Sequence, residues 1–290
     1  MKKIKSVFLI LIVVVAIGLF GFWLRGRQRV EQAKVAKEKA TIKLTFIEGW
    51  TLRDYQDYLI EQGLLKKDDP EFKNLVGEVA FYPSILIKDY RLKAEALPVE
   101  QIINQRKFLQ DLSLESLEGY LFPDTYIFNK NYPLESLVNM MLNNFEKKIP
   151  SEMQQEIRRQ GKSLDQIITV ASLVEAEARY KEDRQLVADI IWRRFSNAMP
   201  LQLDSTVNYV TGGKKPSISL KEQEVPSPFN TYKNKGLPVG PINNPGIESI
   251  EAAIYPLSNN YWYFLSGTDD EMHYAKNLDE HNLNKIKYLR

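Results

Sequence analysis

Apolar and polar residues recur with helical spacing between residues 163 and 178, which predicts an amphipathic helix. Ser163 is a good N-cap, and Gln166 three residues later completes a capping-box pattern. Glu175 projects into the middle of the apolar arc, whereas Glu177 falls roughly 160° away at its edge. At about 100° per residue, that arc is formed by Leu164, Ile167, Ile168, Ala171, Val174 and Ala178. The pattern therefore places one carboxyl group inside a packing face.

The pattern over residues 41–75 predicts a small α+β module. Alternating apolar and polar residues over 41–47 are typical of a strand. A helix is expected to begin near Thr51 and to end at Gly63, and a second short helix follows Pro70. The apolar face of the first helix consists of Leu52, Tyr55, Leu59 and Ile60.

The second half of the chain is predicted to be mostly helical. Helices are expected from about Pro133 and over residues 182–196. Residues 261–265 read as a strand before a turn at 266–267, with His273 and Tyr274 on the returning strand. The loops at 227–232 and 236–246 are rich in Pro and Gly, which restrict the backbone. Long loops of this kind are more often functional than simple connectors.

An apolar run near the start of the chain predicts a membrane anchor. Val7–Leu24 is a run of 18 residues without charge and without a small-residue cleavage site at its end. Residues 25–40 are charged and helix-prone, and are predicted to form a stalk. Lysines flank one side of the run and several arginines and lysines the other, so the positive-inside rule leans against export of the bulk of the chain.

Composition excludes several kinds of chemistry. Among 290 residues, 39 basic and 37 acidic side chains give a net charge of +2, which is no basic excess of the size that nucleic-acid binding requires. The absence of cysteine excludes disulfides and thiol nucleophiles. His273 and His281 are the only histidines, and their spacing favours neither a zinc site nor a Ser-His-acid triad. The Gly212-Gly213-Lys214 segment lacks the spacing of a phosphate loop. We therefore predict no metal and no cofactor.

The carboxyl of Glu175 is the strongest candidate for chemistry. A carboxylate on an apolar face is costly unless it is paired, so such a group tends to keep its proton and to have a raised pKa. A general acid working near neutral pH needs this property. The structural alternative is an ion pair with Arg179, four residues later on the same helix face.

Several motifs occur together in one order along the chain: LEGYLFPDTY (117–126), ASLVEAE (171–177), LQLDSTVNY (201–209), SPFNTY (227–232), GLPVGPI (236–242), NPG (244–246) and the terminal His273, Asn277, His281 and Asn282. In this respect the chain resembles the endolytic murein transglycosylase family, also known as YceG-like and formerly at times as aminodeoxychorismate lyase. The resemblance covers nearly the whole chain, and residues 46–51 are similar to the start of the family's LysM-like module. It implies an α+β protein with a cytoplasmic stub and a single transmembrane anchor (1–24), a helical stalk (25–40), a LysM-like module (41–112) and a mostly helical catalytic domain with a short β element (113–290).

The resemblance also implies an activity. Family members cut glycan strands of peptidoglycan between N-acetylmuramic acid and N-acetylglucosamine and leave 1,6-anhydro ends. Glu175 takes the catalytic position, and Glu177 is the fallback. The residues expected to line the glycan groove are Gln202, Asp204, Ser205, Asn208, Asn230, Thr231 and Tyr232. Many members have Pro where Ser205 stands and Lys or Arg where Ala176 stands. If the protein is instead a hydrolase with paired carboxylates, Asp204 is the second one.

The expected partners are peptidoglycan strands, the cytoplasmic membrane and the cell-wall synthesis machinery, with the C-terminal domain facing the wall and no nucleic acid. Two alternatives remain open. One is a wall-binding anchor or division scaffold that holds glycan without cutting it. The other is a cytoplasmic-facing lyase, which the charges that flank the apolar run and the older family name suggest.

Overall fold

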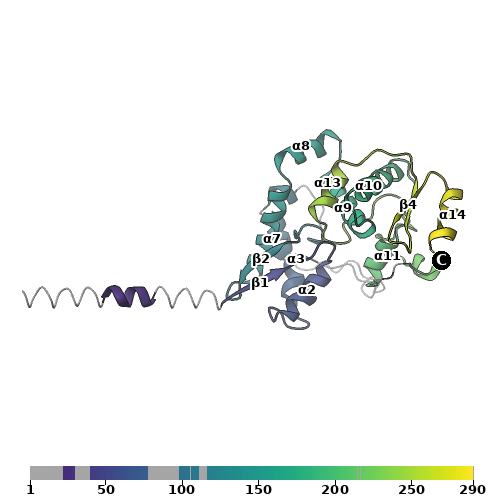
Figure 1. Ribbon diagram of the computed structural model, residues 1–290. Helices are drawn as coiled ribbons and strands as arrows, with labels where there is room; N and C mark the ends of the chain where they lie inside the picture. The colour runs from purple at the N-terminus through teal and green to yellow at the C-terminus, as the bar shows by residue number, and fades with distance from the viewer. Residues whose placement is uncertain are drawn as a thin grey trace, which may run out of the picture. The chain divides into compact units, whose positions relative to one another are not determined.

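The structure is a computed structural model that describes residues 22–29, 40–77, 98–104, 106–110, 116–213, 215 and 217–289. The chain forms two compact units, one of Met1–Leu44 with Tyr126–Pro133 and one of Thr45–Thr125 with Leu134–Arg290. The protein is α+β, and in the described residues helices outnumber the strands of two small sheets (Figure 1). Every candidate site residue lies in the larger unit. The predicted boundaries after residues 24, 40 and 112 stay predictions.

The predicted transmembrane helix has to be corrected. Across the described ranges, no helix is long and apolar enough to cross a membrane. The described helix at residues 22–29 contains only the last three residues of the predicted segment, and it carries Arg25, Arg27 and Arg29. Residues 7–21 and most of the predicted stalk lie outside the described residues.

The predicted small module has the expected strand–helix–helix order. Strand β1 (Thr41–Thr45) pairs with β2 (Thr125–Asn129) in a two-stranded sheet. Helix α2 (Leu52–Glu61) begins after Thr51, which forms a capping box with Asp54. The helix buries Leu52, Tyr55 and Leu59, as predicted. Helix α3 (Glu71–Val76) follows Pro70. Two further helices, α5 (Pro98–Asn104) and α6 (Lys107–Gln110), have no counterpart in the prediction.

Helix α9 (Leu164–Glu177) is the central element of the helical part. Its capping box is present as predicted: Ser163 Oγ accepts the Gln166 N–H, and Gln166 Oε1 accepts the Ser163 N–H, each at 3.1 Å. The helix packs against α8 (Ser151–Arg159), α10 (Lys181–Ser196), α11 (Asp204–Thr211) and α13 (Ile247–Ile254) (Figure 1). Every residue from Ile167 to Val174 is buried. The predicted amphipathic stripe is therefore too narrow, because neighbours surround this helix on several sides.

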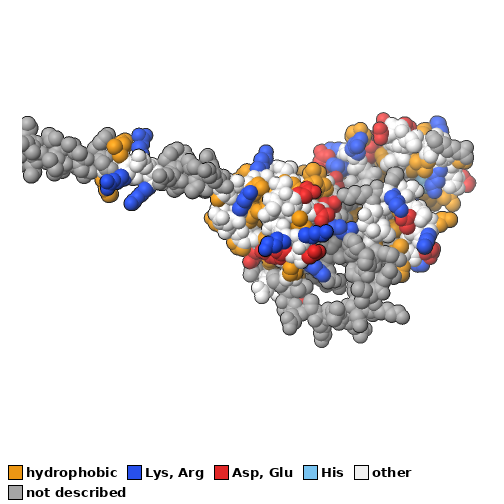
Figure 2. Space-filling view, turned by 90° about the horizontal axis from the view of Figure 1, so that it is seen from below, with side chains coloured by type: hydrophobic (Ala, Val, Ile, Leu, Met, Phe, Trp, Pro, Cys, Tyr) orange, Lys and Arg blue, Asp and Glu red, His pale blue; other side chains and the backbone are white. Residues whose placement is uncertain are grey.

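The remaining elements complete the larger unit. Helix α7 (Leu134–Lys148) starts close to the predicted position and buries Leu137, Met141 and Phe145. Helix α12 (Leu220–Gln223) is short, and α14 (Leu278–Tyr288) ends the described chain. Strands β3 (Tyr263–Ser266) and β4 (Met272–Ala275) form the predicted antiparallel hairpin, with Phe264 opposite Tyr274. On the face shown in Figure 2, acidic and basic side chains of the described residues are interspersed, in keeping with the small net charge.

Candidate active site

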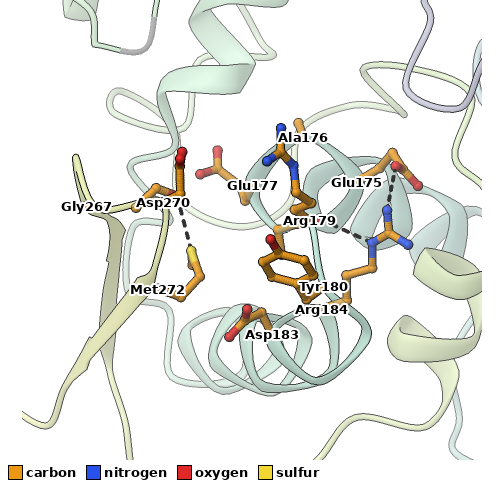
Figure 3. Close-up of a pocket in the computed structure, with 12 residues that line it drawn as sticks. Glu175, Ala176, Glu177, Arg179, Tyr180, Asp183, Arg184, Gly267, Asp270 and Met272 are labelled. Carbon is orange, nitrogen blue, oxygen red and sulfur yellow. Dashed lines mark hydrogen bonds and ion pairs between the residues drawn. The ribbon is translucent and has the colours of Figure 1, made fainter.

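The C-terminal end of α9 forms one wall of a cavity of about 350 Å³. The other walls are the start of α10 and the hairpin of β3 and β4, including Gly267, Asp270 and Met272 (Figure 3). Glu175 and Glu177 both line this cavity, and their side chains leave the helix in different directions. This agrees with the predicted separation of the two carboxyls around the helix. The site therefore offers two carboxyl groups from one helix end.

Arg184 of α10 holds the carboxylate of Glu175. Its Nη2 donates to Glu175 Oε1 at 3.0 Å, and its Nη1 donates to Glu248 Oε2 at 2.7 Å. The Glu175 side chain is 7% exposed and that of Arg184 is 9% exposed. The partner of Glu175 is thus Arg184 and not Arg179, which is exposed. An ion pair of Glu175 was therefore correctly considered, but the predicted partner, Arg179, was wrong.

Arg184 offsets the negative charge at the C-terminal end of α9. The last turn of a helix carries unpaired carbonyl groups, and its partial negative charge disfavours a carboxylate. Arg184 places a cation there, and its Nε also donates to the carbonyl oxygen of Ala178 at 3.2 Å. Ala178 is the C-cap of α9 and has an extended backbone, so the chain leaves the helix at this residue. The guanidinium of Arg184 therefore caps the C-terminal end of α9 and also holds the carboxylate of Glu175.

The second oxygen of Glu175 is bound by a loop that is distant in sequence. The backbone N–H of Gly246, the N-cap of α13, donates to Glu175 Oε2 at 3.0 Å. The carboxyl of Glu48 lies so close to Gly246 that a Cβ on this glycine would be 2.1 Å from Glu48 Oε1. Gly49 approaches as well: its Cβ position lies 3.5 Å from Glu175 Cγ. A side chain at position 246 would therefore displace the Glu48 carboxyl from its present position.

Asn244 connects this loop to the LEGYLFPDTY motif. Its Oδ1 accepts the N–H groups of Gly119 and Leu121 at 3.0 and 3.1 Å. Its Nδ2 donates to the Trp50 carbonyl at 3.1 Å and to Glu118 Oε1 at 3.0 Å. Burial raises the pKa of Glu118 to about 8, although hydrogen bonds from neighbouring groups oppose this shift. The motif therefore acts mainly as a buried support for the loop that carries Gly246.

Glu177 belongs to a second polar cluster. Ser205 Oγ donates to Glu177 Oε1 at 2.6 Å, and the Tyr232 hydroxyl donates to Asp204 Oδ1 at 2.5 Å. Burial raises the pKa of Glu177, against the hydrogen bond from Ser205 and with a further contribution from the charge of Asp204. Burial and the bond to Asp204 also raise the pKa of Tyr232. The tertiary structure thus brings three of the predicted groove residues to the carboxyl of Glu177.

The other predicted groove residues have different surroundings. Gln202 is exposed and has a positive φ of 52°, and Asn208 is half-buried with its amide bound to the Lys215 carbonyl. Asn230 and Thr231 are 0% and 1% exposed. The amide of Asn230 donates to the carbonyls of residues 223 and 225, and Thr231 Oγ1 accepts the N–H of residue 203. These two side chains hold the loop from inside.

Several residues of the site had no role in the sequence-based interpretation. Arg184, Glu48, Glu118 and Gly246 belong to this group, and Asp183 of the cavity wall accepts a hydrogen bond from Tyr274 at 2.5 Å. Gly246 and Glu118 lie in motifs that the sequence did single out, which is the signal that could have found them. Among the described residues, no group of three His, Cys, Asp or Glu side chains could hold a metal ion.

Comparison with known proteins gives one family. The chain is 42% identical over 177 residues to a Bacillus subtilis protein named endolytic murein transglycosylase, covering 60% of this chain and 48% of that protein. A Streptococcus pneumoniae protein (serotype 2, strain D39) of the same name is 31% identical over 271 residues, covering 87% of this chain and 46% of that one. The chain therefore spans about half the length of these relatives.

A solved structure and a family model agree with these relatives. A crystal structure of a yceG-like protein from Listeria monocytogenes superposes with a TM-score of 0.67 at 32% identity, covering 83% of this chain and 75% of that one. The sequence model of the YceG-like family matches residues 25–287, which is most of the chain and includes all of the site described above. The chain belongs to the YceG-like family.

Proposed function

We propose that this protein is a lytic transglycosylase of peptidoglycan and that Glu175 is its general acid and base. The observation that carries the proposal is the fixed carboxyl of Glu175 on the cavity wall, held by Arg184 on one oxygen and by Gly246 on the other. A catalytic group must be held in a defined geometry, and these two contacts supply it. The names of the relatives, endolytic murein transglycosylase, support the reaction class.

One carboxyl group is enough for this reaction. Protonated Glu175 donates its proton to the glycosidic oxygen as the bond between N-acetylmuramic acid C1 and that oxygen breaks. The resulting carboxylate takes the proton of the C6 hydroxyl of the same sugar, whose oxygen then bonds to C1. The product carries a 1,6-anhydro ring, no water is consumed, and Glu175 regains its proton. A carboxyl oxygen that accepts one hydrogen bond still has a lone pair for this proton.

The cluster around Glu177 suits the glycan itself. Sugar hydroxyls and N-acetyl groups bind side chains that both donate and accept hydrogen bonds. Ser205, Asp204 and Tyr232 offer such groups beside the cavity, with Gln202 and Asn208 on the same segment. The proposal therefore assigns these five residues to the glycan groove and gives Asn230 and Thr231 the role of shaping the loop beneath it. In the cell, the domain would act where peptidoglycan strands are accessible, beside the enzymes that synthesise them.

One observation favours a second function, that of a glycan-binding wall protein without activity. Both oxygens of Glu175 accept hydrogen bonds, as they do in many structural ion pairs. In that case the groove would bind strands, and the carboxylate of Glu175 would stay paired with Arg184. A binder requires no proton on this carboxyl, whereas the lytic reaction does.

Mass spectrometry of products from uncrosslinked glycan strands tests these functions. The purified full chain is compared with Glu175→Gln, with Glu177→Gln and with Glu135→Gln, an exposed glutamate of α7. Anhydro-ended fragments from the wild type and Glu135→Gln, but not from Glu175→Gln, are the expected result. Loss in Glu177→Gln alone would move the acid–base role to Glu177. Fragments with reducing ends would indicate a hydrolase with Asp204 as second carboxylate, and binding without fragments would indicate the wall-binding function.

A further inference from the structure

Glu48 is a third carboxyl of the site, and it comes from the segment between β1 and α2. The residue is exposed, yet its carboxyl lies against the Cα of Gly246, where an added Cβ would be 2.1 Å from both Cδ and Oε1. The N–H of the same glycine donates to Glu175 Oε2 at 3.0 Å. The carboxyls of Glu48 and Glu175 therefore contact one glycine, which carries no side chain to separate them.

The backbone holds Glu48 in this position. The N–H of Gly49 donates to the Asn244 carbonyl, and the N–H of Asn244 donates to the Trp50 carbonyl, each at 2.9 Å. Gly49 also has a positive φ of 78°, and its Cβ position lies 3.5 Å from Glu175 Cγ. Two backbone hydrogen bonds thus tie the segment next to Glu48 to the loop that binds Glu175. The fold therefore places the backbone of Glu48 beside the site.

The charges around these carboxyls do not balance. Arg184 forms ion pairs with Glu175 and Glu248, and its positive charge also acts on Glu48. Lys148, at the end of α7, is the other cation that acts on Glu48. Three carboxylates beside one close guanidinium leave an excess of negative charge, which favours the uptake of a proton by the group. Partial burial and then the charge of Glu175 raise the pKa of Glu48, Arg184 and Lys148 lower it, and Glu248 raises it.

We propose that Glu48 is a positioning residue that acts through Glu175: the two carboxyls meet at Gly246, and the negative charge of Glu48 favours the protonated form of Glu175 from which the reaction starts. This inference rests on the proposed function, because that proton is the one Glu175 delivers to the glycosidic oxygen. The negative charge of Glu48 makes loss of this proton to solvent less favourable. In the reaction itself Glu48 gains and loses nothing, since Glu175 recovers its proton from the C6 hydroxyl of the sugar.

The first test is the pH profile of fragment release by the full chain and by Glu48→Gln. Without the charge of Glu48, the protonated form of Glu175 is less favoured, so the alkaline limb of the profile should move down by about one pH unit. Activity on that limb should then fall about tenfold, while activity at the acidic end is kept. Glu61→Gln, an exposed glutamate at the end of α2, is the matched control and should follow the wild type. A Glu48→Gln profile that is lower in height but unchanged in shape would show a structural role only and overturn the inference.

The second test does not depend on activity. Carboxyl ¹³C NMR of the full chain labelled at glutamate follows the titration of Glu48, whose signal is identified by its loss in Glu48→Gln. In Glu175→Gln the midpoint of this titration should fall, because a neighbouring negative charge is removed. An unchanged midpoint would refute the coupling whatever the activity. If the midpoint falls but the wild type releases no fragments at any pH, the coupling stands and the proposed function fails.

Discussion

Glu118→Gln should change how the stability of the protein depends on pH. Glu118 is 2% exposed, and its burial raises the pKa from an ordinary 4.5 to about 8 in the folded state. In the unfolded chain the residue titrates near its ordinary value. A group with a raised folded pKa contributes stability below its unfolded pKa, and this contribution is lost as the pH rises toward the folded pKa. The relevant window therefore runs from about pH 4.5 to about pH 8.

The hydrogen bonds explain why glutamine is a close replacement. Glu118 Oε1 accepts from the Leu52 N–H and from Asn244 Nδ2, each at 3.0 Å, and Oε2 lies 3.1 Å from the Tyr209 hydroxyl oxygen. A protonated carboxyl would accept the first two bonds and donate to Tyr209. The glutamine carbonyl accepts the same two bonds, and its NH₂ group donates to Tyr209. The variant therefore reproduces the neutral form of Glu118 and cannot ionise.

The size of the effect follows from the pKa difference. Each pH unit inside the window changes the free energy of unfolding by at most about 1.4 kcal/mol for one proton. Over the whole window this gives an upper limit of about 5 kcal/mol. Between pH 6 and pH 8 the wild type should lose about 2 kcal/mol relative to Glu118→Gln. The comparison of two variants cancels the contributions of other titrating groups.

Urea unfolding of the full chain at several pH values between 4 and 9, followed by tryptophan fluorescence, measures this difference. The two free energies of unfolding should lie close together at pH 4 and diverge up to about pH 8, with Glu118→Gln the more stable protein. Glu135→Gln, on the exposed face of α7, should run parallel to the wild type. A constant offset between Glu118→Gln and the wild type at every pH would refute a neutral, buried Glu118.

Three further predictions concern the supports of Glu175. Asn244→Ala leaves two buried N–H groups without their acceptor and should lower the free energy of unfolding by about 3 kcal/mol in urea; a loss under about 1 kcal/mol would contradict the role of this side chain. Gly246→Ala puts a Cβ 2.1 Å from the Glu48 carboxyl, so the exposed Glu48 side chain must turn away from Glu175 and release of anhydro fragments should fall. Gly240→Ala, where the Cβ meets nothing within 4 Å, should keep full activity, and equal activities of these two variants would count against the steric argument. Arg184→Lys loses the fork that binds two carboxylates and should lower fragment release at least about tenfold in the same assay, whereas wild-type activity would show that a point charge is enough.

Much of the local structure around the site was predictable from consecutive residues. The capping box of Ser163 and Gln166 starts α9, and Thr51 starts α2, because each cap depends on residues three positions apart. The hairpin of β3 and β4 was also predictable, since its strands are neighbours in sequence and share a short turn. Helical periodicity correctly separated the directions of Glu175 and Glu177. The shared motifs indicated the family, but no helix of the described residues corresponds to the predicted transmembrane helix.

The groups that surround the carboxyls depend instead on the tertiary fold. Spacing along a helix suggested Arg179 as the partner of Glu175, but α9 ends at Glu177 and its C-cap is extended, so Arg179 no longer lies on the helix face. Arg184 reaches Glu175 instead, because α10 turns back against α9. Gly246 binds Glu175 and lies against Glu48, which comes from the opposite end of the sequence, through contacts that no local pattern encodes. Caps and periodicity follow from a few consecutive residues, whereas the pairing of charges depends on the path of the whole chain.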